Sequence, residues 1–320
     1  MFIGVDGGGT KTEMVVLDSE GVIRATHRTG GSSYLALGLE ALGTLLAQGI
    51  ETLLGKAGLR AADVEFAFFG LPAFGEDSSL TSSLSRLPER CLPTDSYLCG
   101  NDMICGWAGS LLCRDGISVV AGTGSICYGE RGELCARAGG WGELFSDEGS
   151  AYWLACRALN LFSRMSDGRE PRSALYDLLR GRLKITHDLD LCGHIYSQLA
   201  GDRAKIAQLG SLVSEAATLG DARASEILTD AARELALLVN ATRSELRFGP
   251  SEPVLVSYSG GVFDNAGASF VDSFTAALRA HGSEYQVCVP QLSPAIGAAL
   301  YAAKRRGRPL SATAIERLQA

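Results

Sequence analysis

The sequence predicts an α/β protein that is built from two similar halves. A strand–turn–strand unit with glycine and threonine in its turn stands near the start of each half, at Asp6–Thr12 and again at Ala121–Ser125. Apolar runs typical of strands alternate with helical spacings after each unit. A chain of 320 residues also has the length of about two domains.

In the first half, apolar runs bounded by turn residues predict short strands, and apolar residues at helical spacing predict one helix. The first glycine-rich stretch lies between two of these strands and does not open a helix. The predicted elements are strands at 2–5, 14–17, 22–26, 64–71 and 96–99 and a helix at 38–57.

The second half repeats this pattern around a long helical segment between Tyr152 and Leu246. We expect the basic tail beyond Arg305 to fray, because it is polar and terminal. The predicted strands are 116–121, 126–129, 254–258 and 285–289, and the predicted helices are 204–219, 222–247, 270–280 and 294–304.

The composition argues against several functional classes. The formal net charge of -7 repels polyphosphate backbones and anionic lipids, so neither nucleic acid nor a membrane is an expected partner. The nine cysteines show no C-x-x-C or zinc-site spacing. With no signal peptide ahead of the first predicted strand, they fit reduced thiols, and we expect a cytoplasmic protein.

The first turn, Asp6-Gly7-Gly8-Gly9-Thr10-Lys11-Thr12, has the residue types of a phosphate site. Glycines let the backbone approach an anion, threonines add hydroxyl donors, and Asp6 at a strand end is suited to hold Mg²⁺ through water. Glycine-rich turns are also common in plain hairpins, and the stretch matches neither GxxxxGK[ST] nor GxGxxG before a helix. Alone, this turn leaves both interpretations open.

The second turn, Gly122-Thr123-Gly124-Ser125, repeats these residue types in the same setting. Two such hairpins favour a nucleotide-binding site much more strongly than either one alone. A third loop, Ser259–Phe263, ends a predicted strand, where ligands of open α/β sheets gather, and its glycines suit packing against adenine or ribose. A tight strand-to-helix turn explains the third loop equally well.

Asn101-Asp102 follows a predicted strand and precedes an apolar segment. A carboxylate at a strand end is well placed to accept a proton from a sugar hydroxyl. Either residue can instead cap the following helix, which is the commoner role for these residue types. The two roles are compatible.

The densest stretch is Gly139–Trp153, which reads GGWGELFSDEGSAYW. Backbone amides between glycines, an indole and acidic side chains suit a ligand with many hydroxyl groups. The alternative is structural, because Asp147 and Glu148 just before a predicted helix complement its N-terminal dipole.

Taken together, these segments resemble the sugar kinase/Hsp70/actin superfamily, and more closely its N-acetylglucosamine kinase branch within the BadF/BadG/BcrA/BcrD ATPase group. The run GGWG-x4-DEGSAYW is the most specific part of the match. The resemblance implies a duplicated, two-domain actin-like ATPase (ribonuclease H-like) fold with ATP and sugar in the interdomain cleft. It implies an N-terminal domain of residues 1–113, closed by a helix at 293–305, and a C-terminal domain of residues 114–292 with a helical insertion.

The implied activity is ATP-dependent phosphorylation of an amino sugar, with the 6-hydroxyl of N-acetylglucosamine as the first candidate and Mg²⁺ as the cofactor. Asp102 is implied as the general base and Asp6 as the residue that serves Mg²⁺. Around the sugar the resemblance implies Ser33, Asn101, Asp102, Thr123, Gly140, Trp141, Gly142, Asp147 and Ala151. Around ATP it implies Gly8, Gly9, Thr10, Lys11, Thr12, Gly122, Thr123, Gly124, Ser125, Gly260 and Gly261. Related kinases are often dimers, so a homodimer stays open.

One departure concerns the identity of the sugar. Where N-acetylglucosamine kinases carry an asparagine that touches the sugar, this chain has Ser33. The shorter hydroxyl changes both reach and hydrogen bonding, so glucosamine and other amino or anhydro sugars stay open as substrates.

Three rival functions are weaker. BadF-type ATPases that act on a partner enzyme carry a cluster-binding cysteine just before the second loop, where this chain has Val119-Val120. A sugar-responsive repressor needs a DNA-binding module, and only five residues precede Asp6. A sensor without turnover is disfavoured because the candidate base and both phosphate loops are present.

Overall fold

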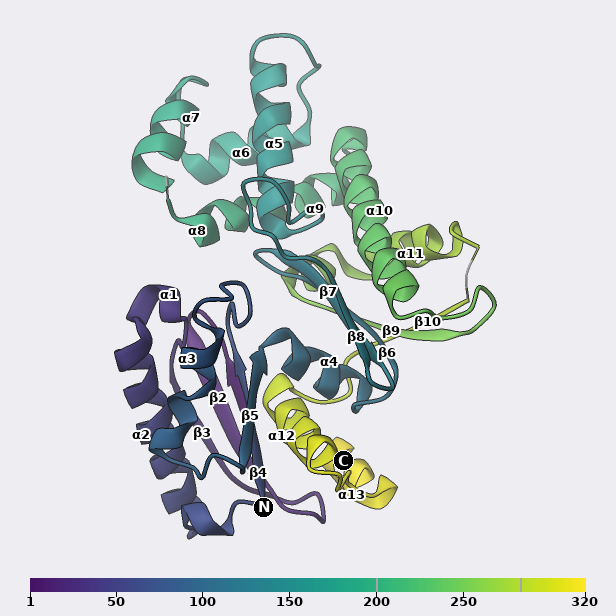
Figure 1. The fold of residues 1–320 in the computed structure, drawn as a ribbon. Helices are drawn as coiled ribbons and strands as arrows, with labels where there is room; N and C mark the ends of the chain where they lie inside the picture. Colours follow the sequence, from purple (N-terminus) through teal and green to yellow (C-terminus); the bar gives the residue numbers. More distant parts are fainter. Residues whose placement is uncertain (200, 283) are drawn as a thin grey trace. The chain divides into compact units, whose positions relative to one another are not determined.

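The computed structural model describes residues 1–199, 201–282 and 284–320. The chain divides into two compact units, each with a five-stranded mixed sheet (Figure 1). Unit 1 consists of residues 1–114 and 290–320, and unit 2 consists of residues 115–289.

The two sheets have the same topology. In unit 1 the strand order is β3-β2-β1-β4-β5, with antiparallel pairing from β1 to β3 and parallel pairing from β1 through β4 to β5. In unit 2 the order β8-β7-β6-β9-β10 repeats every one of these pairings. The predicted duplication is therefore confirmed. The strands are β1 (Phe2–Gly7), β2 (Lys11–Leu17), β3 (Ile23–Gly30), β4 (Phe66–Leu71), β5 (Tyr97–Asn101), β6 (Gly116–Ala121), β7 (Ser125–Arg131), β8 (Leu134–Gly139), β9 (Val254–Ser259) and β10 (Tyr285–Cys288).

Strand β1 is buried on both faces, and the alternation of its side chains explains how. Ile3 and Val5 join the core with helix α2 (Leu39–Ala57), whose buried leucines recur at helical spacing. On the other face, Gly4 admits helix α12 (Pro294–Arg305), since a Cβ there would lie 3.0 Å from the Ala298 carbonyl carbon. Unit 1 therefore needs the C-terminal segment to cover its sheet. Its other helices are α1 (Tyr34–Leu37), α3 (Thr81–Ser85) and α4 (Met103–Leu111), with 3₁₀ turns at Ala61–Asp63 and Leu87–Arg90.

The expectation that the tail frays is wrong. Residues Ala312–Gln319 form helix α13, in which Ala314 is buried and the Ser311 hydroxyl accepts a capping hydrogen bond from the Ala314 N–H at 3.2 Å. Arg317 donates a hydrogen bond to the Glu20 carbonyl in the β2–β3 turn. A buried side chain and a cap thus outweigh the polar composition of the tail.

Unit 2 carries most of the helices. The predicted helix 204–219 is interrupted, and the predicted helix 270–280 begins earlier, at Gly261, with a kink at Gly267. The prediction missed strand β8, because Leu134–Gly139 contains no β-branched or aromatic residue. The helices are α5 (Ala151–Ser166), α6 (Ala174–Leu183), α7 (Asp190–Gly193), a π-helix at His194–Leu199, α8 (Arg203–Ala207), a 3₁₀ turn at Gln208–Gly210, α9 (Ser211–Thr218), α10 (Ala222–Glu245) and α11 (Gly261–Arg279).

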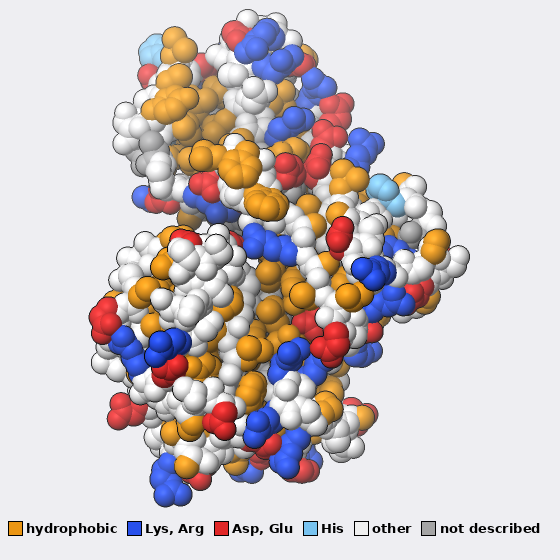
Figure 2. Space-filling view, viewed as in Figure 1, with side chains coloured by type: hydrophobic (Ala, Val, Ile, Leu, Met, Phe, Trp, Pro, Cys, Tyr) orange, Lys and Arg blue, Asp and Glu red, His pale blue; other side chains and the backbone are white. Residues whose placement is uncertain are grey.

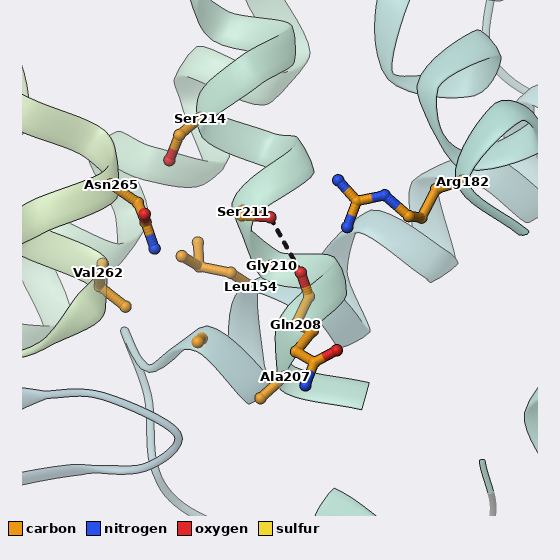
Figure 3. Close-up of a pocket in the computed structure, with 10 residues that line it drawn as sticks. Leu154, Arg182, Ala207, Gln208, Gly210, Ser211, Ser214, Val262 and Asn265 are labelled. Carbon is orange, nitrogen blue, oxygen red and sulfur yellow. Dashed lines mark hydrogen bonds between the residues drawn. The ribbon is translucent and has the colours of Figure 1, made fainter. Parts of the chain in front are cut away.

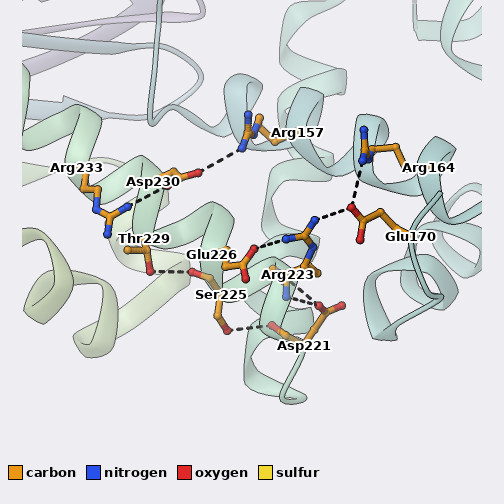
Figure 4. Close-up of polar contacts among 11 residues, drawn as sticks. Arg157, Arg164, Glu170, Asp221, Arg223, Ser225, Glu226, Thr229, Asp230 and Arg233 are labelled. Atoms are coloured by element: carbon orange, nitrogen blue, oxygen red, sulfur yellow. Dashed lines mark hydrogen bonds and ion pairs between the residues drawn. The ribbon is translucent and has the colours of Figure 1, made fainter.

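Charged side chains link α5 and the segment after it to α10 (Figure 4). Arg157 pairs with Asp230 at 3.3 Å, and Arg223 pairs with Glu170 at 2.6 Å. Exposed pairs of this kind contribute at most about 1 kcal/mol each. The network therefore adds little to the stability of the fold.

On the face shown in Figure 2, positive and negative side chains are interspersed over both units. Some large hydrophobic side chains are exposed in the helical part of unit 2, among them Leu189 and Tyr196. Among the described helices, none has the length and hydropathy of a membrane-spanning segment.

Candidate active site

The first glycine-rich turn connects β1 to β2 and packs against the residues after β3. The Ser32 N–H donates a hydrogen bond to the Gly8 carbonyl at 2.9 Å, and a Cβ on Gly31 would lie 2.6 Å from the Gly9 carbonyl carbon. The hydroxyls of Ser32 and Thr12 are buried without a hydrogen-bond partner in the described part of the chain. Buried polar atoms are nearly always paired, so a ligand or ordered water is their expected partner.

The tip of this turn is exposed, and its charged residue is already paired. Gly9, Thr10 and Lys11 are exposed, and the Lys11 ammonium lies 2.7 Å from the Glu13 carboxylate. An exposed pair of this type is worth at most about 1 kcal/mol, so a polyphosphate can readily displace it. The predicted phosphate role of Lys11 requires this exchange of partners.

Two aspartates gather at the carboxyl edge of the unit 1 sheet. The pKa of Asp6 is raised to about 7, first because its carboxyl is shielded from water and next because the charges of Asp102 and Glu13 lie near it. The Cys105 thiol, which is fully buried, hydrogen-bonds to Asp6 and partly opposes this shift in the pKa of Asp6. Asp6 and the neighbouring Asp102, whose charge raises the pKa of Asp6, are a donor set that suits a divalent cation.

The structure separates the two roles that the sequence left open for Asn101 and Asp102. The Asn101 side chain accepts a hydrogen bond from the Met103 N–H at 3.1 Å and donates one to the Phe74 carbonyl at 3.2 Å. It therefore caps helix α4. The Asp102 side chain makes no capping hydrogen bond, so its carboxylate is not committed to the helix.

Ser33 lies at the start of the short helix α1, next to the buried Ser32. Its backbone is extended, its side chain is half-buried, and it makes no capping hydrogen bond. Its predicted contact with the sugar stays a prediction.

The second glycine-rich turn connects β6 to β7 in unit 2 and is bound to the start of α5. The Ala151 N–H donates to the Gly122 carbonyl at 2.9 Å, and the Tyr152 N–H donates to the Thr123 carbonyl at 3.3 Å. The Ser125 hydroxyl donates to the Glu148 carbonyl at 2.7 Å, so it holds the loop rather than pointing freely outward. The second turn and the DEGSAYW segment are thus one structural element.

The glycine-rich stretch before α5 presents its aromatic residues to solvent. Gly140 and Gly142 have positive φ angles, and the Trp141 side chain between them is 71% exposed. Leu144 and Phe145 are exposed as well. A Cβ on Gly140 would lie 2.7 Å from the Ile126 side chain, which fixes the loop on β7.

Asp147 is buried and is held by Arg203, a residue that the sequence did not single out. The Asp147 side chain is 2% exposed, and Arg203 pairs with it and also approaches Glu143 at 3.4 Å. Burial raises the pKa of Asp147, and the positive charge of Arg203 opposes this rise. A Cβ on Gly124 would lie 2.7 Å from the Asp147 carboxylate, so this acid lies directly against the second turn.

The third loop abuts the second. Gly260 has a φ of 104° and ends β9, and a Cβ there would lie 2.5 Å from the Ala121 carbonyl oxygen. Only glycine allows both the backbone angle and this close approach. Gly261 then begins helix α11. The Phe263 N–H donates to the Gly260 carbonyl at 3.0 Å, so the N–H groups of Gly261 and Val262 are the ones suited to meet an anion.

A cavity of about 290 Å³ lies beside these two loops, between α9 and α11 (Figure 3). Leu154, Ala207 and Val262 give it apolar walls. Its polar groups are neutral except for one guanidinium. The lining residues are Ala151, Leu154, Arg182, Ala207, Gln208, Gly210, Ser211, Ser214, Val262 and Asn265.

The predicted site residues thus form one cluster in each unit. In unit 1, Asp6, Asn101 and Asp102 meet at the sheet edge. In unit 2, the second turn, Asp147, Ala151 and Gly260-Gly261 lie together. The sequence analysis missed Arg203, Cys105 and the polar residues of the cavity, because no local pattern links them to the loops that they contact.

Known proteins resemble this chain over nearly its whole length. An N-acetyl-D-glucosamine kinase from Dictyostelium discoideum is 29% identical, over 94% of this chain and 97% of the relative. An N-acetylmuramic acid/N-acetylglucosamine kinase from Clostridium acetobutylicum is 30% identical, with the same two coverages. The solved structure of a candidate N-acetylglucosamine kinase from Chromobacterium violaceum has a TM-score of 0.69 at 26% identity, covering 93% of this chain and 97% of that one. The predicted two-domain actin-like fold is confirmed.

The match to a family described as the BadF/BadG/BcrA/BcrD ATPase family runs from residue 3 to residue 302. It takes in all ten strands and helix α11, and it ends within α12. The chain therefore belongs to the BadF/BadG/BcrA/BcrD ATPase family.

Proposed function

We propose that this protein is an ATP-dependent kinase of an amino sugar, with the 6-hydroxyl of N-acetylglucosamine as the first candidate acceptor. The observation that carries the proposal is the pair Asp6 and Asp102 at one sheet edge, where the charge of Asp102 raises the pKa of Asp6 and Asn101 provides the capping hydrogen bond of helix α4. The sugar kinase names of the two curated relatives support the same reaction class.

The proposed reaction is a single phosphoryl transfer. The Asp102 carboxylate accepts the proton of the sugar hydroxyl, and the hydroxyl oxygen forms a bond to the γ-phosphorus of ATP. The bond between that phosphorus and the bridging oxygen breaks, and ADP leaves with its electron pair. Catalysis then depends mainly on positioning and on stabilisation of charge, which backbone amides around the phosphates supply.

Unit 2 supplies the nucleoside site in this proposal. The cavity between α9 and α11 combines apolar side chains with neutral hydrogen-bonding side chains, which suits the ring faces and polar edges of a nucleoside. The second turn and the start of α11 present backbone N–H groups next to it, which suit the phosphates.

Asp6 is the residue proposed to serve Mg²⁺, which would neutralise charge on the ATP phosphates. Mg²⁺ is usually held by one or two carboxylates together with substrate phosphates and water. The two neighbouring aspartates fit that donor set. We also expect the enzyme to work in the cytoplasm, where its nine free cysteines would stay reduced.

The test is ADP release with Mg-ATP across N-acetylglucosamine, glucosamine, N-acetylmannosamine, glucose and anhydro-N-acetylmuramic acid. Release that depends on one amino sugar supports the proposal and names the substrate. Steady hydrolysis that ignores every sugar would contradict it, and would favour an ATPase that acts on a protein partner.

A further inference from the structure

We propose that Arg182 is a nucleotide-recognition residue, whose guanidinium stacks on the base of the nucleotide in the α9–α11 cavity. This inference rests on the proposed function, because it takes that cavity as the nucleoside site. It adds a specificity residue from helix α6, which no sequence motif indicated.

Arg182 is the single charged residue among those that line the cavity. It is exposed, and in the described part of the chain its guanidinium has no acidic partner. Arg180, two positions earlier on α6, is bound to Asp188, so unpaired charge is not general on this helix. An arginine without a counter-charge at the mouth of a cavity whose other polar groups are neutral is suited to receive a ligand.

Several neutral side chains around the cavity also lack partners in the described structure. The amides of Gln208 and Asn265 and the hydroxyl of Ser214 make no hydrogen bond there, while the Ser211 hydroxyl donates to the Gln208 carbonyl at 2.9 Å. Amides and hydroxyls can each donate or accept. These groups therefore discriminate little between adenine and guanine. Stacking of the Arg182 guanidinium is then the main interaction that holds a base.

The position of Arg182 favours contact with the base over contact with the phosphates. In Figure 3, Val262 and Asn265 of α11 lie on one side of Ser211, and the Arg182 side chain reaches in from the other side. The phosphate-binding candidates adjoin α11, because Gly260 at its start packs on Ala121 and Gly122. The guanidinium thus closes the side away from those loops.

A planar guanidinium is weakly hydrated and stacks well on aromatic rings. Such contacts contribute about 0.5–2 kcal/mol, which corresponds to roughly 2–30-fold in affinity. Stacking is tolerant of base identity, because every base has a π-face. ATP and GTP should therefore depend on Arg182 to a similar extent.

The experiment measures binding of Mg-ATP, Mg-GTP and base-free tripolyphosphate to the full chain, for the wild type and for Arg182→Ala, Arg182→Lys and Arg279→Ala. Arg279 is an exposed arginine at the far end of α11, outside the cavity, and serves as the matched control. We expect Arg182→Ala to raise the Kd of both nucleotides by roughly 2–30-fold and to leave tripolyphosphate binding unchanged. Arg182→Lys should recover only part of the loss, and Arg279→Ala should match the wild type.

An unchanged nucleotide Kd in Arg182→Ala would overturn the inference. An equal loss for tripolyphosphate would also overturn it, since it would assign Arg182 to the phosphates. The sugar-dependent release of ADP separates the two proposals. If the wild type binds ATP through Arg182 but no sugar stimulates ADP release, the kinase proposal fails while this inference stands.

Discussion

The two units share one sheet topology but differ in chemistry at the same strand positions. Asp6 on β1 pairs in register with Glu13 on β2 and Gly70 on β4. The corresponding residue of unit 2 is Val120 on β6, which pairs with Ile126 and Ser259. Both units therefore have the same backbone turn, but the paired strand positions beside it are acidic in unit 1 and apolar in unit 2.

The difference extends to the last strand of each sheet. Strand β5 leads into Asn101-Asp102 and helix α4, whereas β10 ends at Cys288 and is followed by the segment that returns to unit 1. Unit 2 therefore has no counterpart of Asp102. It has instead a cavity whose lining is neutral except for Arg182, and a buried aspartate that is paired with arginine. In the proposed function, unit 1 therefore carries proton transfer and metal binding, and unit 2 carries nucleoside binding.

The largest expected effect comes from the residue that unit 2 lacks. Asp102→Asn should lower sugar-dependent turnover by roughly 10²–10⁴-fold, the usual contribution of a general base, while ATP binding persists. ADP release and nucleotide titration measure the two quantities separately. Asp95→Asn, at an exposed position of the same unit, is the control. Turnover at the wild-type level in Asp102→Asn would remove Asp102 from this role.

Asp6→Asn removes the charge at the strand position that the apolar residue Val120 occupies in unit 2. The pKa of Asp6 in the folded protein, about 7, lies above its ordinary value of 3.8. The charge of Asp6 therefore destabilises the metal-free fold, with its full effect above pH 7 and no effect once the pH falls to about 4. Asp6→Asn should therefore raise the free energy of unfolding at pH 8 by up to about 4 kcal/mol in the presence of a chelator.

Denaturant titrations at pH 8 and pH 4 measure that difference. At pH 4 the variant and the wild type should have nearly equal stability. A variant that is less stable than the wild type at pH 8 would show that the charge of Asp6 does not destabilise the fold. The difference between Asp6 and Val120 would then not explain a difference in stability.

Arg203→Met tests the buried acid of unit 2. Without the guanidinium, Asp147 stays buried with its charge unpaired, and we expect a loss of stability of about 1–3 kcal/mol at neutral pH. The pKa of Asp147 is already raised by burial, so the loss should grow as the pH rises from the acid range. Thermal unfolding at several pH values measures this dependence.

A double variant separates the charge from the packing. Adding Asp147→Asn to Arg203→Met should restore much of the lost stability, because a neutral amide replaces the unpaired carboxylate. If the double variant is as unstable as Arg203→Met, packing of the arginine rather than its charge supports the loop.

The smallest effect concerns the sugar. Ser33→Asn should shift the ratio of kcat/KM toward N-acetylglucosamine over glucosamine by roughly 5-fold, the value of one hydrogen bond. Ser32→Ala is a matched neighbour that removes a buried hydroxyl instead. An unchanged ranking of sugars in Ser33→Asn would show that Ser33 does not determine specificity.

The sequence predicted the elements whose signals are local. Apolar runs bounded by glycine gave β1, β4, β6 and β9 and the turns beside them, because burial on both faces demands continuous apolar residues. It could not decide whether Asn101 or Asp102 caps α4, since both stand at the same helix end. Only the hydrogen bond from the Asn101 amide to the distant Phe74 carbonyl orients Asn101 for this role.

Long-range partners were not predictable in this way. Arg203 follows Asp147 by 56 positions, and nothing in the spacing connects them. The same holds for α13. Its polar sequence suggested fraying, but its buried residue Ala314 packs against the β2–β3 turn. Contacts between residues that are far apart in the sequence leave no periodic pattern in it.

The division of unit 1 into two stretches of sequence has a consequence during synthesis. Unit 2 is one continuous stretch, and all of its strands have left the ribosome once residue 289 emerges. Unit 1 still lacks α12 at that stage, so Gly4 and its neighbours on β1 remain uncovered. Domains generally fold as units while the chain grows. The first unit therefore stays incomplete while the second folds, and the aggregation-prone interval lasts until helix α12 has been made.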